Sequence, residues 1–102
     1  MSLSAEVCAA LADLGLQGVR EVARLGGGSI NHVRLLEASA GTHVVLKEHA
    51  RAPGDFYARE ADGLRLLRST PAGPSAPEPL AWSSTFLLLD YLEPKAPVAS
   101  AR

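Results

Sequence analysis

The chain has 102 residues, of which 47% are hydrophobic and 21% are charged; this composition excludes a disordered chain and is typical of one folded domain. Its formal net charge of -1, without a run of Lys and Arg, argues against nucleic acid or a membrane surface as a partner. The one cysteine, Cys8, excludes an internal disulfide framework and fits a reducing compartment. The sequence opens without a signal-peptide pattern, and its longest apolar run, Phe86 to Leu89, is too short to span a bilayer. We therefore expect a cytoplasmic protein.

The first predicted element is a helix over residues 4–14, within the segment 1–15. Ser4 is a suitable N-cap, and Gly15 is a suitable stop. The apolar residues that recur at helical spacing are Leu3, Val7, Leu11 and Leu14. We expect this helix to serve packing.

Residues 19–25 alternate imperfectly and predict a strand that leads into the glycine-rich segment 26–31. Adjacent glycines let bare backbone N–H groups approach an anion such as phosphate. The segment is neither a Walker loop nor a dinucleotide fingerprint, because no helix is predicted after it and Asn31 replaces the third glycine. The remaining phosphate-binding interpretation is the kinase arrangement, in which the loop joins two antiparallel strands and the next strand supplies a lysine. A merely flexible turn is the alternative.

Two more strands are predicted to complete an antiparallel meander over residues 19–49. Residues 31–38 form the second strand, Ser39 to Thr42 a tight connection, and Thr42 to His49 a β-branched third strand. The third strand contains the run Val44-Val45-Leu46-Lys47, which fits the kinase lysine strand. Period two places Lys47 on the face of Val45 and opposite to Leu46.

A second helix is predicted over residues 55–69, with Asp55 as its N-cap. Its expected apolar stripe consists of Phe56, Leu64 and Leu67. Glu60 falls inside this stripe, and a carboxylate on a buried face costs several kcal/mol unless a cation meets it. We identify Lys47 as the candidate cation. The alternative is that Glu60 reaches the edge of the stripe and pairs with solvent or with Arg68.

Prolines between residues 69 and 79 indicate an extended connector. Residues 80–82 predict a short fourth strand with Trp82 in the core, Ser83-Ser84 a turn, and Thr85 to Leu92 a fully buried fifth strand. The proline-bearing piece that follows is typical of a hinge. The three histidines lack metal-ligand partners at suitable spacing, and Ser29 lacks the pattern of a hydrolase nucleophile.

This order of elements is that of a kinase small lobe, and the chain resembles the fructosamine (ketosamine-3) kinase family, which has the aminoglycoside-phosphotransferase-like kinase fold. The residues that carry the resemblance are Gly26-Gly27-Gly28-Ser29-Ile30-Asn31, Val45-Leu46-Lys47, the run from Phe56 to Leu67, and the run from Phe86 to Leu92. The resemblance implies an α+β fold: a protein-kinase-like small lobe whose antiparallel five-stranded sheet carries an N-terminal helix and an αC-type helix. We expect one nucleotide-binding domain over residues 1–102, with the last strands and hinge at residues 80–92.

The resemblance also implies ATP as cofactor, a ketoamine as substrate, and a role for each matching residue. The glycine loop (Gly26, Gly27, Gly28, Ser29, Ile30 and Asn31) would cover the phosphates. Lys47 would bind the α and β phosphates, and Glu60 would hold it. Backbone groups of Asp90 and Leu92 would meet the adenine. Leu89 would be the gatekeeper, and Val45 would lie against the ring. Ser29 stands where many members carry cysteine, which argues against thiol-based redox control.

The resemblance does not extend to a catalytic loop. The sequence has no His-Gly-Asp or His-Arg-Asp motif, and its aspartates, Asp13, Asp55, Asp62 and Asp90, stand in other contexts. We expect the catalytic base and the Mg²⁺ site to belong to an absent C-terminal lobe, so that this chain alone transfers no phosphate. We also expect the open face to allow homo-oligomers.

Two alternatives remain at this stage. One is the lobe of an aminoglycoside, choline or homoserine-type phosphotransferase, because the substrate is chosen by the absent lobe. The other is a non-catalytic dimerisation module in which the glycines form only a turn. That module would be favoured if Glu60 pointed to solvent and a partner chain covered the last strand.

Overall fold

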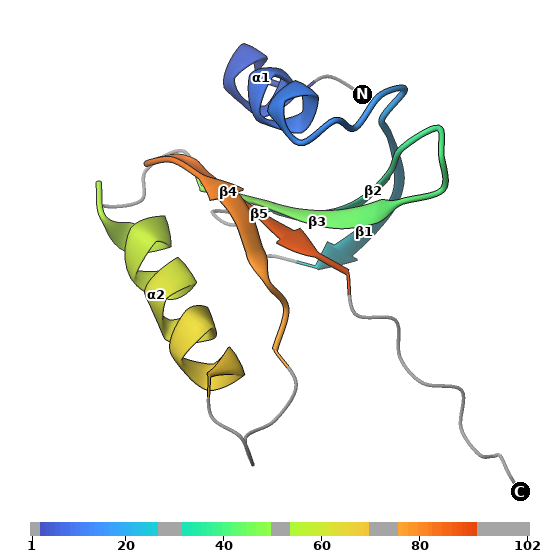
Figure 1. The fold of residues 1–102 in the computed structure, drawn as a ribbon. Coiled ribbons are helices and arrows are strands. Elements are labelled where there is room, and N and C mark those ends of the chain that lie inside the picture. Colours follow the sequence, from blue (N-terminus) through green and yellow to red (C-terminus); the bar gives the residue numbers. More distant parts are fainter. Residues whose placement is uncertain (1–2, 27–31, 50–53, 70–75, 92–102) are drawn as a thin grey trace, which may run out of the picture.

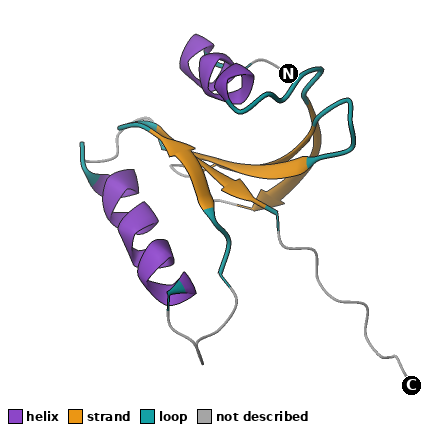
Figure 2. Ribbon diagram, viewed as in Figure 1, coloured by secondary structure: helices purple, strands orange, loops and turns teal. Residues whose placement is uncertain are grey.

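The computed structural model describes residues 3–26, 32–49, 54–69 and 76–91. Its elements are α1 (Ala5–Asp13), β1 (Arg20–Gly26), β2 (His32–Glu37), β3 (His43–Glu48), α2 (Phe56–Arg68), β4 (Pro79–Trp82) and β5 (Phe86–Asp90). The strands form one antiparallel sheet in the order β1-β2-β3-β5-β4, with the two helices on opposite sides of it (Figure 1). The expected α+β fold of a kinase small lobe is confirmed (Figure 2). No helix in these described ranges is long and apolar enough to cross a membrane.

Helix α1 begins as predicted. The Ser4 side chain accepts a hydrogen bond from the Val7 N–H at 3.2 Å, and Gly15, just after the helix, has φ 77°. Val7 and Leu11 are buried against the sheet, but Leu14 is 37% exposed, so its prediction as part of the packed stripe is wrong. Leu14 is the C-cap, where the chain turns away, and Leu16 packs on the core after the turn.

The meander over β1, β2 and β3 is confirmed. Between β2 and β3 the chain turns at Gly41, whose φ of 93° suits glycine, and the Ala38 N–H donates to the Thr42 carbonyl at 2.8 Å. The pairing of β2 with β3 is regular from His32 opposite Glu48 to Glu37 opposite His43. The pairing of β1 with β2 shifts register twice. The strand next to the glycine-rich segment is therefore the irregular one.

Alternation along the strands divides the core into two clusters. The α1-side cluster contains Val7, Leu11, Leu36, Val44, Leu46, Phe86 and Leu88. The α2-side cluster contains Tyr57, Ala61, Leu87 and Leu89, with Val45, Leu64 and Trp82 packed against it. Because β5 lies between β3 and β4 and contributes to both clusters, it is buried on both faces, as its continuous apolar run predicts.

Helix α2 spans the predicted residues but turns a different face to the sheet. Its buried residues are Tyr57 and Ala61, whereas Phe56 and Leu67 are 40% and 43% exposed. The predicted stripe of Phe56, Leu64 and Leu67 is therefore wrong except for Leu64, which is half-buried. The physical reason is steric: a small Ala61 lets the helix lie close to β5, and Tyr57 fills the space one turn earlier.

The ends of α2 and β5 differ from expectation in detail. Asp55 is at the N-cap position, but its side chain makes no capping hydrogen bond and pairs instead with Arg59 at 2.8 Å. Strand β5 ends at Asp90 and Tyr91 follows it outside the strand, so the predicted extension beyond Asp90 is wrong. Leu92 lies outside the described residues. Trp82 packs against the α2-side cluster as predicted, with the Arg65 guanidinium carbon 4.8 Å from its ring centroid.

Candidate functional site

Lys47 and Glu60 meet on the α2 face of the sheet. Lys47 is in β3 and Glu60 is in α2, and the lysine Nζ donates to the Glu60 Oε2 in an ion pair. The two side chains are 23% and 27% exposed, so water reaches them only in part. The pairing predicted from the buried carboxylate is confirmed. Arg68, the alternative partner, donates instead to the Ala76 carbonyl at 2.9 Å.

The packing of α2 brings this pair together. Tyr57 and Ala61, which flank Glu60 along the helix, are fully buried against Leu87 and Leu89 of β5. Leu87 lies directly opposite Lys47 in the pairing of β3 with β5. The apolar contacts therefore hold Glu60 over the lysine. Glu60 lies at the edge of the packed face and not within it, which lowers the cost of burying its charge.

Beside the ion pair, a row of apolar side chains crosses the same face. Leu35, Val45 and Leu89 are directly opposite one another in β2, β3 and β5. Val45 shares the face of Lys47 by alternation, and Leu89 is 6% exposed. Two half-buried aliphatic side chains and one buried one next to a held ammonium suit a ligand that has a flat ring and an anionic group.

Val33 belongs to this site and was missed from the sequence. It lies opposite Lys47 in the pairing of β2 with β3 and therefore on the same face. The signal was present, because the kinase loop reads Gly-x-Gly-x-x-Gly-x-Val. Gly26 and Gly28 match its first two glycines, Asn31 replaces the third, and Val33 matches the valine.

The predicted hinge is described only at its start. The Asp90 N–H donates to the Glu78 carbonyl at 3.0 Å, and the Asp90 carboxylate accepts from the Glu78 N–H at 2.5 Å. The Asp90 N–H is therefore engaged within the sheet. The other predicted site residues, Gly27, Gly28, Ser29, Ile30, Asn31 and Leu92, lie outside the described residues.

Tyr57 is a second neighbour that sequence reasoning did not single out. Its side chain is fully buried between α2 and the sheet. Burial, and next the carboxylates of Glu60 and Glu48, raise the pKa of Tyr57 to about 12. The phenol therefore stays neutral well above physiological pH and does not compete with Glu60 for Lys47. Among the described residues, Glu60 is the only ion-pair partner of Lys47.

The histidines do not form a metal centre in the part of the chain that the structure describes. His43 lies 3.2 Å from a Glu37 oxygen, and His49 packs on the Phe56 ring with centroids 5.8 Å apart. Within the four described ranges, no group of three or more His, Cys, Asp or Glu residues is placed to hold a metal ion.

Comparison with known proteins gives one match. The model of a protein family described as fructosamine kinase matches residues 5–101, nearly the whole chain. No curated protein matches the chain. No solved structure matches it either.

Proposed function

Because the chain belongs to the fructosamine kinase family, a family of phosphotransferases, we propose that it is the ATP-binding lobe of a kinase that phosphorylates ketoamines on proteins or small amines. The observation that carries this proposal is the Lys47–Glu60 ion pair beside an apolar row on one face of the sheet. The reaction class is inferred from the family. The face of the sheet on which the nucleotide would lie is inferred from the position of the ion pair.

In this proposal the chain binds and positions the nucleotide. Lys47 neutralises the α and β phosphates, and Glu60 keeps its ammonium in place. The glycine loop from Gly26 to Asn31 covers the phosphates with backbone N–H groups. Val45 and Leu89 contact the adenine ring, which also meets the Asp90 carbonyl and the Leu92 backbone. Phosphoryl transfer depends mostly on positioning and charge neutralisation, and these residues would contribute to both.

The remaining chemistry would come from a second lobe. Mg²⁺ would neutralise charge on the phosphates, held by that lobe together with the catalytic base. The aspartates of this chain support that division, because Asp55 pairs with Arg59 and Asp90 binds the Glu78 backbone. Asp13 and Asp62 are exposed on the helices. We therefore propose that this chain binds nucleotide but transfers no phosphate by itself.

Other functions find less support. The dimerisation module would have been favoured by a Glu60 that points to solvent, whereas Glu60 pairs with Lys47. An aminoglycoside or choline kinase would need the same nucleotide lobe, but the family match favours ketoamines. The free Cys8 thiol agrees with the cytoplasm as the proposed location.

The test measures ATP binding by the 102-residue chain and by its Lys47→Met variant. Binding is monitored by changes in NMR chemical shifts as the ATP concentration is raised into the millimolar range. We expect shifts around Val45 and Leu89, and an affinity that falls about tenfold or more without the ammonium, since a charge-assisted hydrogen bond contributes about 1.5–3 kcal/mol. Arg20→Met is the control, because it removes an ion pair whose arginine is 70% exposed.

Equal binding by the wild type and Lys47→Met would contradict the assignment of the site. Phosphorylation of fructosyl-lysine by this chain alone would contradict the proposed division between two lobes.

A further inference from the structure

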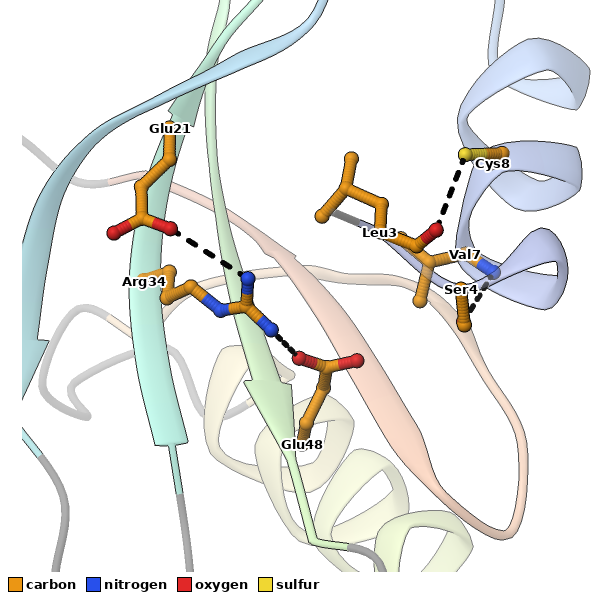
Figure 3. A network of polar contacts seen from close by, with 7 residues as sticks. All are labelled: Leu3, Ser4, Val7, Cys8, Glu21, Arg34 and Glu48. Carbon is orange, nitrogen blue, oxygen red and sulfur yellow. Dashed lines mark hydrogen bonds and ion pairs between the residues drawn. The ribbon is translucent and has the colours of Figure 1, made fainter. Parts of the chain in front are cut away.

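Arg34 joins three strands through two carboxylates on the sheet face opposite to Lys47 (Figure 3). Its Nη2 binds the Oε1 of Glu48 in β3, and its Nη1 lies 3.5 Å from the Oε1 of Glu21 in β1. Arg34 itself is in β2, between the two. We call Glu21, Arg34 and Glu48 the cross-strand triad.

The triad is largely buried at the margin of the α1-side core. The Arg34 side chain is 15% exposed, and each carboxylate side chain is 22% exposed. Arg34 lies opposite Leu46, a fully buried member of that core, and two residues before Leu36, another member. Arg34 and Glu48 lie toward the end of the sheet at which the glycine-rich segment begins, and Glu21 lies near the start of β1.

Stability alone does not account for this arrangement. Replacing a buried ion pair or triad by apolar side chains of similar size is often neutral or stabilising. Among the described residues the Arg34 Nε is also buried without a hydrogen-bond partner, which adds a further cost. The triad instead fixes the relative positions of three strands, because one planar guanidinium binds carboxylates on both neighbouring strands.

The neighbouring strand has particular need of such a constraint. The pairing of β1 with β2 shifts register between Glu21 and Ala23 and again between Arg24 and Gly26. Bulges bend a strand and loosen its ladder. Glu21 precedes both shifts, and Glu48 directly follows Lys47. The triad thus connects the β1–β2 hairpin, which carries the glycine-rich segment, to the residue next to the lysine.

We propose that Arg34 is a positioning residue that holds the β1–β2 hairpin in place relative to Lys47 from the far side of the sheet. Arg34 touches no ligand in this proposal. It acts by keeping the loop and the lysine at the separation that a nucleotide requires. The proposal rests on the proposed function, since its consequence is nucleotide affinity.

The test compares the wild type with Arg34→Met, an apolar side chain of similar length, and uses three measurements. Amide hydrogen exchange in β1 should accelerate about tenfold more than exchange in β5, because local opening depends on local contacts. The melting temperature should fall, because the substitution leaves the largely buried Glu21 and Glu48 carboxylates without their cation. The affinity for ATP, measured well below that temperature, should fall about tenfold.

Arg20→Met is the matched control. It removes the exposed ion pair between Arg20 and Glu37, which links the same two strands one residue before Glu21 and leaves the triad intact. We expect it to leave both exchange near Gly26 and ATP affinity unchanged. If Arg34→Met does not fold, Glu21→Gln serves in its place, because it removes one charge and keeps the shape of the side chain.

Unchanged exchange in β1 would overturn the proposal. Faster exchange with undiminished ATP affinity would also overturn it, because Arg34 would then act only on the strand ladder. If the wild type binds no ATP, the proposed function is overturned, and the exchange measurement alone decides whether Arg34 anchors the hairpin.

Discussion

Lys47 and Glu60 form an ion pair whose importance is positional. Their side chains are 23% and 27% exposed, which is intermediate between a surface pair and a dry one. Withdrawing two charges from water costs roughly as much free energy as their attraction supplies, so the pair adds little to folding. Its effect is to hold an ammonium on the α2 face, where in the proposed function phosphate oxygens would provide further partners.

Tyr57 is the residue whose environment changes its chemistry most clearly. Its pKa is raised from 10.0 to about 12, mainly by burial and further by the carboxylates of Glu60 and Glu48. Below pH 10 the phenol is protonated in both the folded and the unfolded chain, so it adds no pH dependence there. Between pH 10 and 12 the unfolded chain loses the proton while the folded chain keeps it. The free energy of unfolding therefore falls as pH rises through this window.

The prediction is a late titration of Tyr57. The chain has two tyrosines, so Tyr91→Phe leaves Tyr57 as the single phenol, and tyrosinate absorbance should then appear with a pKa of about 12. In Tyr57→Phe the alkaline decrease in unfolding free energy described above should be lost. Titration of Tyr57 near its usual pKa of 10.0 would show that the phenol is not buried as described.

At the scale of elements, the two helices begin in different ways although both have a favourable N-cap residue. Ser4 accepts a hydrogen bond from the Val7 N–H. The Asp55 side chain accepts none from the helix backbone, because its φ of -102° and ψ of 10° depart from the extended conformation of a cap and its carboxylate turns to Arg59. Residue type at a cap therefore predicts where a helix begins but not how its end is satisfied.

We predict unequal costs for removing the two caps. Ser4→Ala should lower the free energy of unfolding by about 1 kcal/mol, because α1 loses its capping bond and carries Val7 and Leu11 into the core. Asp55→Ala should lower it by about 0.5 kcal/mol or less, since it removes an exposed i,i+4 pair. Urea denaturation of the two variants measures both values. A larger cost for Asp55→Ala would mean that its carboxylate caps α2 after all.

The whole molecule has one covered face and one that is only partly covered. Helix α1 and the α1-side cluster close the first face. On the other, α2 covers β5 and β4, while two large apolar residues of the helix remain exposed, Phe56 and Leu67. Phe56 and Leu67 lie on the Glu60 side of α2, four residues before it and seven after. In the proposed kinase a second lobe covers this side, and we propose that when the 102 residues are studied alone a second copy covers it.

The prediction is therefore concentration-dependent self-association, measured by light scattering. Leu67→Glu should shift the chain toward the monomer, because it places a charge on the Glu60 side of α2. Leu66→Glu is the control, since Leu66 is 70% exposed on the outward side of the same helix. A monomer at high concentration, or an equal effect of both substitutions, would contradict an interface on this side.

Elements and their order follow from the sequence because their causes are local. Glycine and proline break segments, alternation distinguishes Val45 and Lys47 from Leu46, and a continuous apolar run identifies β5. The Lys47–Glu60 pair was also predicted, although the stripe of Phe56, Leu64 and Leu67 that suggested it is wrong in two of its three residues. The family pattern of loop, lysine and helix supplied the rest of the candidate site.

Only the tertiary structure decided which face α2 turns to the sheet, where Asp55 finds its partner, and that Arg34 bridges three strands. Helical periodicity gives the angles between side chains, but the rotation of the whole helix depends on the surface that receives it, here Leu87 and Leu89. Arg34 meets Glu48 across 14 residues of chain. Such contacts depend on how the sheet twists and bulges. The twist and the bulges result from many small packing contributions, so no single stretch of sequence predicts them.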